Sequence, residues 1–127
     1  MIKTLIDLQR NSKATCAIVR TDEYKRLFSS LAMKANVSDK FLFSNKLPPF
    51  AEKLDKICKE NKMCYFVIKE IDEAIIESQE RFIGLIKDRE MNGYYLPDNC
   101  IIVFTVKNRD SLKNVSPKLY HFAVVAF

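Results

Sequence analysis

Glycine is scarce in this 127-residue chain, which contains only Gly84 and Gly93. A loop that cradles phosphate needs several backbone N–H groups converging on one anion, and the positive φ angles involved favour glycine. The composition therefore excludes a glycine-rich phosphate loop. Histidine is scarcer still, because His121 is the only one, so a Ser–His or Cys–His catalytic pair would depend on it alone. We interpret His121 as a partly buried structural residue.

Clustered metal ligands are also missing from the sequence. The four cysteines show no CxxC spacing and no histidines near them; they are Cys16, Cys58, Cys64 and Cys100. This pattern argues against a structural zinc site or a redox motif. We expect all four to be small buried hydrophobic residues in a reducing compartment, and we expect neither a metal nor a cofactor.

Long apolar runs are absent, which bears on the class of protein. The chain has no stretch of about 18 uninterrupted apolar residues, and its N-terminus lacks the apolar segment and cleavage site of a signal peptide. Hydrophobic residues still make up 48% of the chain, enough for a folded core. We expect one domain over residues 1–127, cytoplasmic and with no membrane contact.

The net charge is +5 and the isoelectric point is near 9.0, values that would permit binding to nucleic acid or another acidic surface. Basic and acidic residues are interleaved, however, as in residues 52–56 and 59–62. A solvated helix face explains such runs at least as well as a binding stripe does.

The order of apolar patterns predicts an α/β fold. Short apolar runs predict strands at residues 15–19, 41–43, 63–68, 101–106 and 122–127. Helical spacing predicts helices at residues 1–9, 21–35, 50–61 and 73–88, the last burying Ile76, Phe82, Ile83 and Ile86. Asn92-Gly93 predicts a small hairpin near residues 90–96, and Ser116-Pro117 predicts a helical turn. Strands alternating with helices indicate a three-layer α/β/α domain with a mostly parallel five-stranded sheet.

Four segments of the C-terminal half carry a family resemblance. Residues 68–72 are similar to the Asp-Glu-Ile of a Walker B strand, and residues 92–99 to a hairpin followed by a Leu-Pro turn. Residues 105–109 lie where a sensor 1 asparagine belongs, and residues 116–122 look like a segment ending in Asp-Arg-Phe. Together they resemble the core of an AAA+ ATPase, closest to the MoxR-type branch, which implies a P-loop-NTPase-like fold.

The chain departs from this family wherever the family binds nucleotide. If residues 19–26 are laid on the Walker A turn, Lys25 falls on the phosphate lysine, but every glycine is missing and Arg26 replaces the Ser or Thr. Lys69 stands in place of the aspartate that holds magnesium, where an ammonium repels a dication. The alternative is that Lys69 belongs to an ordinary strand end that extends its charge into solvent.

Further parts of the catalytic machinery are missing. Tyr120-His121-Phe122 lacks the arginine finger, and the chain stops at Phe127, before the family's helical lid. The resemblance leaves four remnants of a nucleotide site, which are Lys25, Lys69, Glu70 and Asn108. Glu70 and Asn108 also have a structural alternative, because each residue type caps helices or turns.

Three functions follow from this pattern. We expect a catalytically inactive AAA+-like domain that acts as a protein-interaction or assembly subunit, with a protein partner or a second copy of itself. Its candidate contact surface is the hairpin of Asn92, Gly93, Tyr94 and Tyr95, because exposed tyrosines give large contact area at low entropic cost.

Two alternatives remain beside this function. One is a basic nucleic-acid-binding domain that uses the vacated nucleotide cleft, with contacts from Lys25, Arg26, Lys69, Lys107 and Arg109. The other is a residual ATP-binding protein that relies on Lys25, Glu70 and Asn108 alone.

Overall fold

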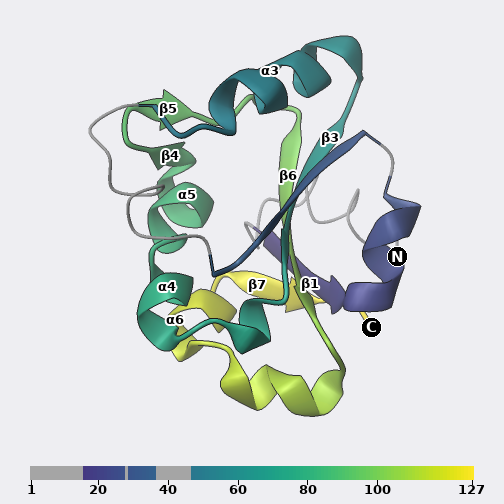
Figure 1. Ribbon diagram of the computed structural model, residues 1–127, viewed down its shortest axis with the longest axis vertical. Helices are drawn as coiled ribbons and strands as arrows, with labels where there is room; N and C mark the ends of the chain where they lie inside the picture. Colours follow the sequence, from purple (N-terminus) through teal and green to yellow (C-terminus); the bar gives the residue numbers. More distant parts are fainter. Residues whose placement is uncertain (1–15, 28, 37–46) are drawn as a thin grey trace.

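A five-stranded parallel sheet forms the centre of the fold. The computed structural model describes residues 16–27, 29–36 and 47–127, with the side chains of residues 24–26 outside this description. The strands are β1 (Cys16–Arg20), β2 (Ser30–Lys34), β3 (Cys64–Lys69), β6 (Cys100–Val106) and β7 (Ala123–Val125). Their order across the sheet is β2-β3-β6-β1-β7 (Figure 1). The strands predicted near residues 15, 63 and 101 are therefore neighbours.

The central strands are apolar throughout because both of their faces are buried. All seven residues of β6 are buried, as are the first five of β3. Such continuous runs are typical of parallel strands covered on both sides. They are also why residues 63–68 and 101–106 were correctly predicted as strands.

Side chains alternate between two hydrophobic clusters, one on each face of the sheet. The larger cluster contains Phe66, Ile102 and Phe104 from the sheet, together with residues of the described helices and of the hairpin. The smaller cluster contains Val19, Val67 and their neighbours on the opposite face.

The described helices are short apart from α3 (Ala51–Glu60). The others are α4 (Ile76–Glu80), α5 (Ile83–Asp88) and α6 (Pro117–Tyr120), with 3-10 helices η1 (Thr21–Arg26), η2 (Ile71–Glu73) and η3 (Arg109–Asn114). Within the described residues, no helix is long and apolar enough to cross a membrane.

The predicted hairpin is confirmed. Its strands β4 (Glu90–Met91) and β5 (Tyr94–Tyr95) pair antiparallel. Asn92 and Gly93 between them have φ angles of 52° and 82°. Positive φ at both central positions is what a type I′ turn requires, and Asn-Gly accommodates it.

The helix predicted over residues 21–35 is wrong in its second half. Residues 30–34 form β2, which pairs in parallel with β3. Leu31 and Met33 pack against the core while Ala32 and Lys34 are exposed, so the burial repeats every two residues. Pairing with a buried neighbour thus outweighs the helical spacing of Leu27 and Leu31. The helix predicted at residues 1–9 and the strand predicted at 41–43 lie outside the described residues.

The single helix predicted over residues 73–88 is divided into α4 and α5. Phe82 and Ile86 are buried as expected, but Ile76 is 46% exposed. Gln79 is buried in its place, because its amide bonds three backbone groups. A polar anchor therefore determines which side of α4 faces inward.

Candidate functional site

The candidate site is the carboxyl edge of the sheet, where β1, β3 and β6 end. Parallel strands bring their carboxyl ends to one edge, and ligands of open α/β sheets bind there. The register of the strands places Arg20 beside Val106 and Ile68 beside Phe104. The residues that follow at this edge are Lys69, Glu70, Lys107, Asn108 and Arg109, and η1, which contains Lys25 and Arg26, follows β1.

Thr105 links two of the loops at this edge. Its side chain is fully buried. The Thr105 Oγ1 accepts a hydrogen bond from the Glu70 backbone N–H at 2.8 Å and one from the Thr21 hydroxyl at 3.2 Å. The segments that follow β1 and β3 are therefore tied together through Thr105 of β6.

Glu70 occupies a left-handed backbone conformation, with φ 60° and ψ 44°. Its carboxylate lies 3.5 Å from the Lys34 ammonium, which comes from the edge strand β2. Lys34 is also the register partner of Lys69. The structural alternative for Glu70 was that its side chain caps the following helix. Its side chain makes no such capping bond, and its carboxylate pairs with a lysine of the sheet.

The Lys34 ammonium that pairs with the Glu70 carboxylate competes with a metal ion for this position. Unit charges about 4 Å apart at an effective dielectric near 20 interact by roughly 4 kcal/mol. The Lys34–Glu70 pair is partly exposed, with side chains 62% and 32% accessible, so screening reduces its strength.

Asn108 caps a helix at this edge. Its Oδ1 accepts hydrogen bonds from the Ser111 backbone N–H at 3.0 Å and from the Ser111 hydroxyl at 3.1 Å. These bonds begin η3 and use the oxygen that a sensor asparagine would offer to a nucleotide or water. The structural role that the sequence left open for Asn108 is the one observed.

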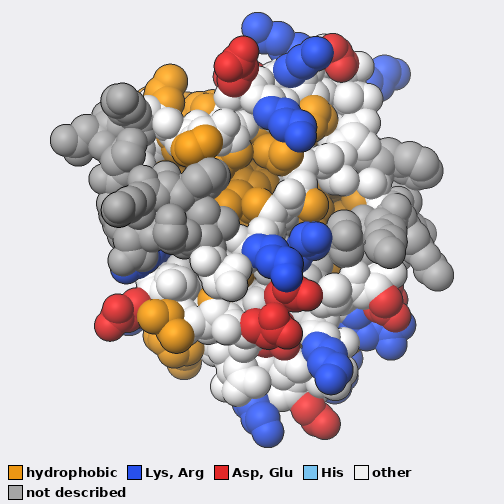
Figure 2. Space-filling view, viewed as in Figure 1, with side chains coloured by type: hydrophobic (Ala, Val, Ile, Leu, Met, Phe, Trp, Pro, Cys, Tyr) orange, Lys and Arg blue, Asp and Glu red, His pale blue; other side chains and the backbone are white. Residues whose placement is uncertain are grey.

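The cations proposed for nucleic-acid binding lie among acids. Lys107 donates its backbone N–H to Asp72 Oδ2 at 3.5 Å. The Arg109 guanidinium hydrogen-bonds the backbone oxygen of Phe127 and lies 5.2 Å from the centre of its ring. Basic and acidic side chains are interspersed over the face in Figure 2, without one continuous basic stripe on that face. The side chains of Lys25 and Arg26 lie outside the described residues.

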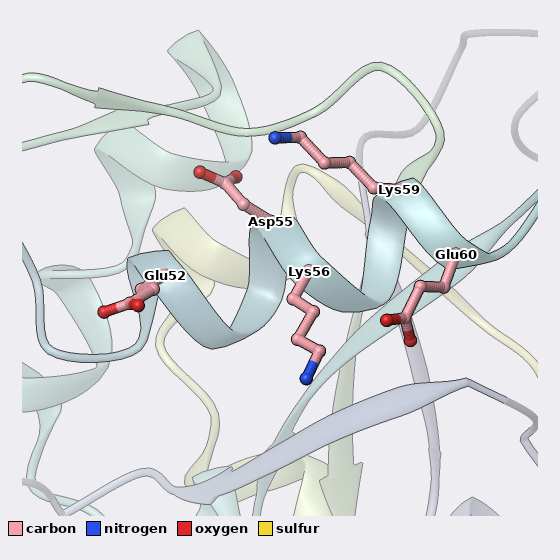
Figure 3. A pocket seen from close by; sticks show the side chains of 5 residues that line it. All are labelled: Glu52, Asp55, Lys56, Lys59 and Glu60. Carbon is pink, nitrogen blue, oxygen red and sulfur yellow. The ribbon is translucent and has the colours of Figure 1, made fainter.

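Two cavities lie along α3, away from the carboxyl edge. One of about 380 Å³ is lined only by charged residues, which are Glu52, Asp55, Lys56, Lys59 and Glu60. Figure 3 shows them spread along the helix, with Asp55 and Lys59 extending to one side and Lys56 to the other. A mixed-charge helix surface of this kind agrees with the solvated face predicted for these residues.

The hairpin exposes only one of its two tyrosines. Tyr95 is 72% exposed, whereas Tyr94 is 5% exposed and donates its hydroxyl to Asp55 Oδ1 at 2.8 Å. Burial, and then this hydrogen bond, raises the pKa of Tyr94. The prediction that both tyrosines form a contact surface is therefore wrong for Tyr94, which anchors the hairpin to α3.

All four cysteines are buried, as predicted, but the expectation that they are reduced is wrong for two of them. Cys58 and Cys64 form a disulfide, with their Cα atoms 5.3 Å apart. Cys16 and Cys100 are free and buried, and burial raises the pKa of Cys16 to about 12. CxxC spacing could not reveal the pair, because the turn between α3 and β3 brings together two cysteines six positions apart.

His121 differs from its predicted environment as well. It is exposed, and its ring contacts Phe122 edge-on, with centroids 5.2 Å apart. A Ser–His or Cys–His catalytic pair built on His121 would therefore have to form at the protein surface.

The sequence matches no protein-family model and no curated protein.

Proposed function

We propose that this chain is a catalytically inactive domain of the AAA+-like, P-loop-NTPase-like type that works through protein contacts, as an interaction or assembly subunit. Support for the scaffold comes from a parallel sheet in which β1, β6 and β3 are neighbours, with a hairpin before β6. That arrangement is the one the motif resemblance requires.

The observation that carries the proposed loss of catalysis is the internal use of the polar groups at the carboxyl edge. Glu70 bonds Thr105 through its N–H and pairs with Lys34 through its carboxylate. Asn108 bonds Ser111. Catalysis of phosphoryl transfer depends on such groups being directed at the phosphates and the metal.

The segment after β1 gives no support to residual ATP binding. It is the six-residue 3-10 helix η1, with Asp22 and Glu23 in its first turn. Arg20 reaches those two carboxylates at 3.7 and 3.1 Å. Negative side chains at the start of a helix occupy the position that favours an anion, so they compete with phosphate there.

The alternative of a nucleic-acid-binding domain is weaker for a similar reason. The edge carries Lys107 and Arg109, but Asp72 contacts the backbone of Lys107 and Asp110 follows Arg109. Affinity for a phosphate backbone comes mainly from its neutralisation by Lys and Arg, and nearby carboxylates offset that attraction. No feature of the described edge favours this alternative over protein contact.

Tyr95 is the residue best placed to make a protein contact. It lies on a hairpin whose other tyrosine is bonded to Asp55, so the turn is held while the Tyr95 ring extends outward. Phe50 packs edge-on against Tyr94 at 5.9 Å and adds to this anchoring. An exposed aromatic ring on a rigid support is typical of an interface hot spot.

We expect the wild-type chain to self-associate and the Tyr95→Ala variant to do so at least about tenfold more weakly. Losing a hot-spot residue costs about 2 kcal/mol or more, and about 1.4 kcal/mol is already a factor of ten. Light scattering coupled to size-exclusion chromatography over a range of protein concentrations measures this. Tyr120→Ala is the matched control, since Tyr120 is 42% exposed but belongs to α6 and not to the hairpin. A Tyr95→Ala variant that assembles as well as wild type contradicts the proposed surface, and a wild-type chain that stays monomeric contradicts self-association through it.

A further inference from the structure

Three cysteines from three separate elements converge at the amino edge of the sheet. Cys58 lies in the last turn of α3, Cys64 begins β3 and Cys100 begins β6. Their three sulfur atoms all lie within 4.8 Å of one another. The residues are 6%, 0% and 2% exposed, respectively. We call this group the cysteine cluster; it lies at the opposite end of β3 and β6 from the candidate site.

The backbone around the cysteine cluster is fixed by one asparagine. Asn99 Nδ2 donates to the backbone oxygens of Cys58 at 2.8 Å and Asn61 at 2.9 Å. The Asn99 backbone oxygen accepts from the Cys64 N–H at 2.9 Å. Cys64 is in turn the register partner of Cys100. Asn99 therefore holds the ends of α3, β3 and β6 together whether or not the sulfurs are bonded.

We propose that, when its thiols are reduced, the cysteine cluster binds one zinc ion through its three sulfur atoms. Thiolate is a preferred ligand of zinc, and Zn–S bonds of about 2.3 Å place neighbouring sulfurs about 3.8 Å apart in a tetrahedral site. The observed limit of 4.8 Å is close to this spacing. The Cys58–Cys64 disulfide is the oxidised form of the same cluster, and it withholds two of the ligands.

The charge of such a site is matched by a neighbouring cation. Three thiolates and one zinc ion carry a net charge of −1, which is costly to bury alone. Arg89 Nη2 donates to the backbone oxygens of Pro97 at 2.7 Å and Cys100 at 2.9 Å, which fixes its guanidinium beside the cluster. The arginine thereby supplies the compensating positive charge.

A cavity gives access to the cysteine cluster at Cys58. It has a volume of about 170 Å³ and is lined by Asp55, Cys58, Lys59, Pro97 and Asn99. Zinc sites with three protein ligands keep a fourth position for water or a small molecule. This cavity provides an entry path for the ion and room for that fourth ligand.

A phosphine reductant converts the Cys58–Cys64 disulfide into two of the three thiols that the zinc site requires. The phosphine supplies two electrons to the S–S bond, takes an oxygen atom from water and leaves two thiols. Zinc then displaces one proton from each of the three thiols as the Zn–S bonds form. Loading is therefore favoured by reducing conditions and by higher pH.

Cobalt titration of the phosphine-reduced full chain tests this proposal. We expect thiolate-to-cobalt charge-transfer absorption that saturates at one Co²⁺ per chain and disappears when zinc is added. The unreduced wild-type chain should show no such absorption. Cys16→Ala, which removes a buried cysteine outside the cluster, should behave as wild type. Cys100→Ala should bind Co²⁺ more weakly by over about 100-fold, the upper end of what losing a supporting partner costs.

Two results would overturn the proposal. One is the absence of charge-transfer absorption from the reduced wild-type chain, and the other is equal absorption from Cys100→Ala. Circular dichroism of each variant checks that it is folded. If Cys100→Ala fails to fold, the test is the comparison of Co²⁺ absorption between reduced and unreduced wild type. That comparison requires no substitution.

Discussion

Gln79→Ala is expected to lower the free energy of unfolding by about 3 to 5 kcal/mol, since each buried polar group left without a partner costs about 1–3 kcal/mol. Gln79 is fully buried. Its Nε2 donates to the backbone oxygens of Ala74 at 2.9 Å and Asn114 at 2.8 Å, and its Oε1 accepts from the Ser116 N–H at 2.6 Å. The substitution deprives all three backbone groups of their partner at once.

Urea denaturation measures this loss, and Glu77→Ala is its matched control. Glu77 lies in the same short helix but is exposed, so its removal should change stability by no more than about 0.5 kcal/mol. Because small domains are stable by only about 5–15 kcal/mol, Gln79→Ala should have a clearly lower midpoint. A variant within about 1 kcal/mol of wild type would show that Gln79 does not hold α4 to the segment before α6.

Phe66→Ala should cost about 3–5 kcal/mol, the usual range for removing a buried phenylalanine. Phe66 is fully buried in β3. Its ring lies 4.6 Å from that of Phe50, just before α3, and Phe50 contacts Tyr94 of the hairpin. The substitution therefore leaves a cavity where β3, α3 and the hairpin meet.

The same denaturation experiment with Phe66→Leu separates the cavity from a general effect of substitution. Leucine keeps most of the apolar volume, so we expect a loss of less than about 1.5 kcal/mol. Equal losses of unfolding free energy in the alanine and leucine variants would contradict a packing role for Phe66.

Local patterns were sufficient to predict much of this fold. The central strands β3 and β6 are continuous apolar runs, α3 has a regular apolar stripe, and Asn92-Gly93 specifies its turn. Each of these signals lies within one segment of the chain, so none depends on knowing its neighbours.

The errors arose where long-range contacts decide the structure. Residues 30–34 become a strand because β3 pairs with them, and Gln79 turns inward because its partners come from residues 74, 114 and 116. The disulfide depends likewise on the turn between α3 and β3. Spacing along the chain contains none of these contacts.

The bonding of the candidate-site residues could not be read from the sequence. Lys69, Glu70 and Asn108 stand at or just after the ends of β3 and β6, which are neighbours in the sheet, so the strand pattern accounts for their position at its carboxyl edge. The bond from Glu70 to Thr105 and the pair with Lys34 could not be predicted, since the first needs a left-handed backbone and the second needs β2.

Calorimetric titration of the chain with ATP, with and without magnesium, tests the proposed loss of nucleotide chemistry most directly. We expect no heat of binding under either condition, because the edge lacks a phosphate loop and its Glu70 and Asn108 are bonded internally. Lys69→Asp, which supplies the acidic pair of a Walker B strand, should also fail to bind. Saturable binding of ATP by the wild-type chain that requires magnesium would contradict the proposal that this scaffold is catalytically inactive.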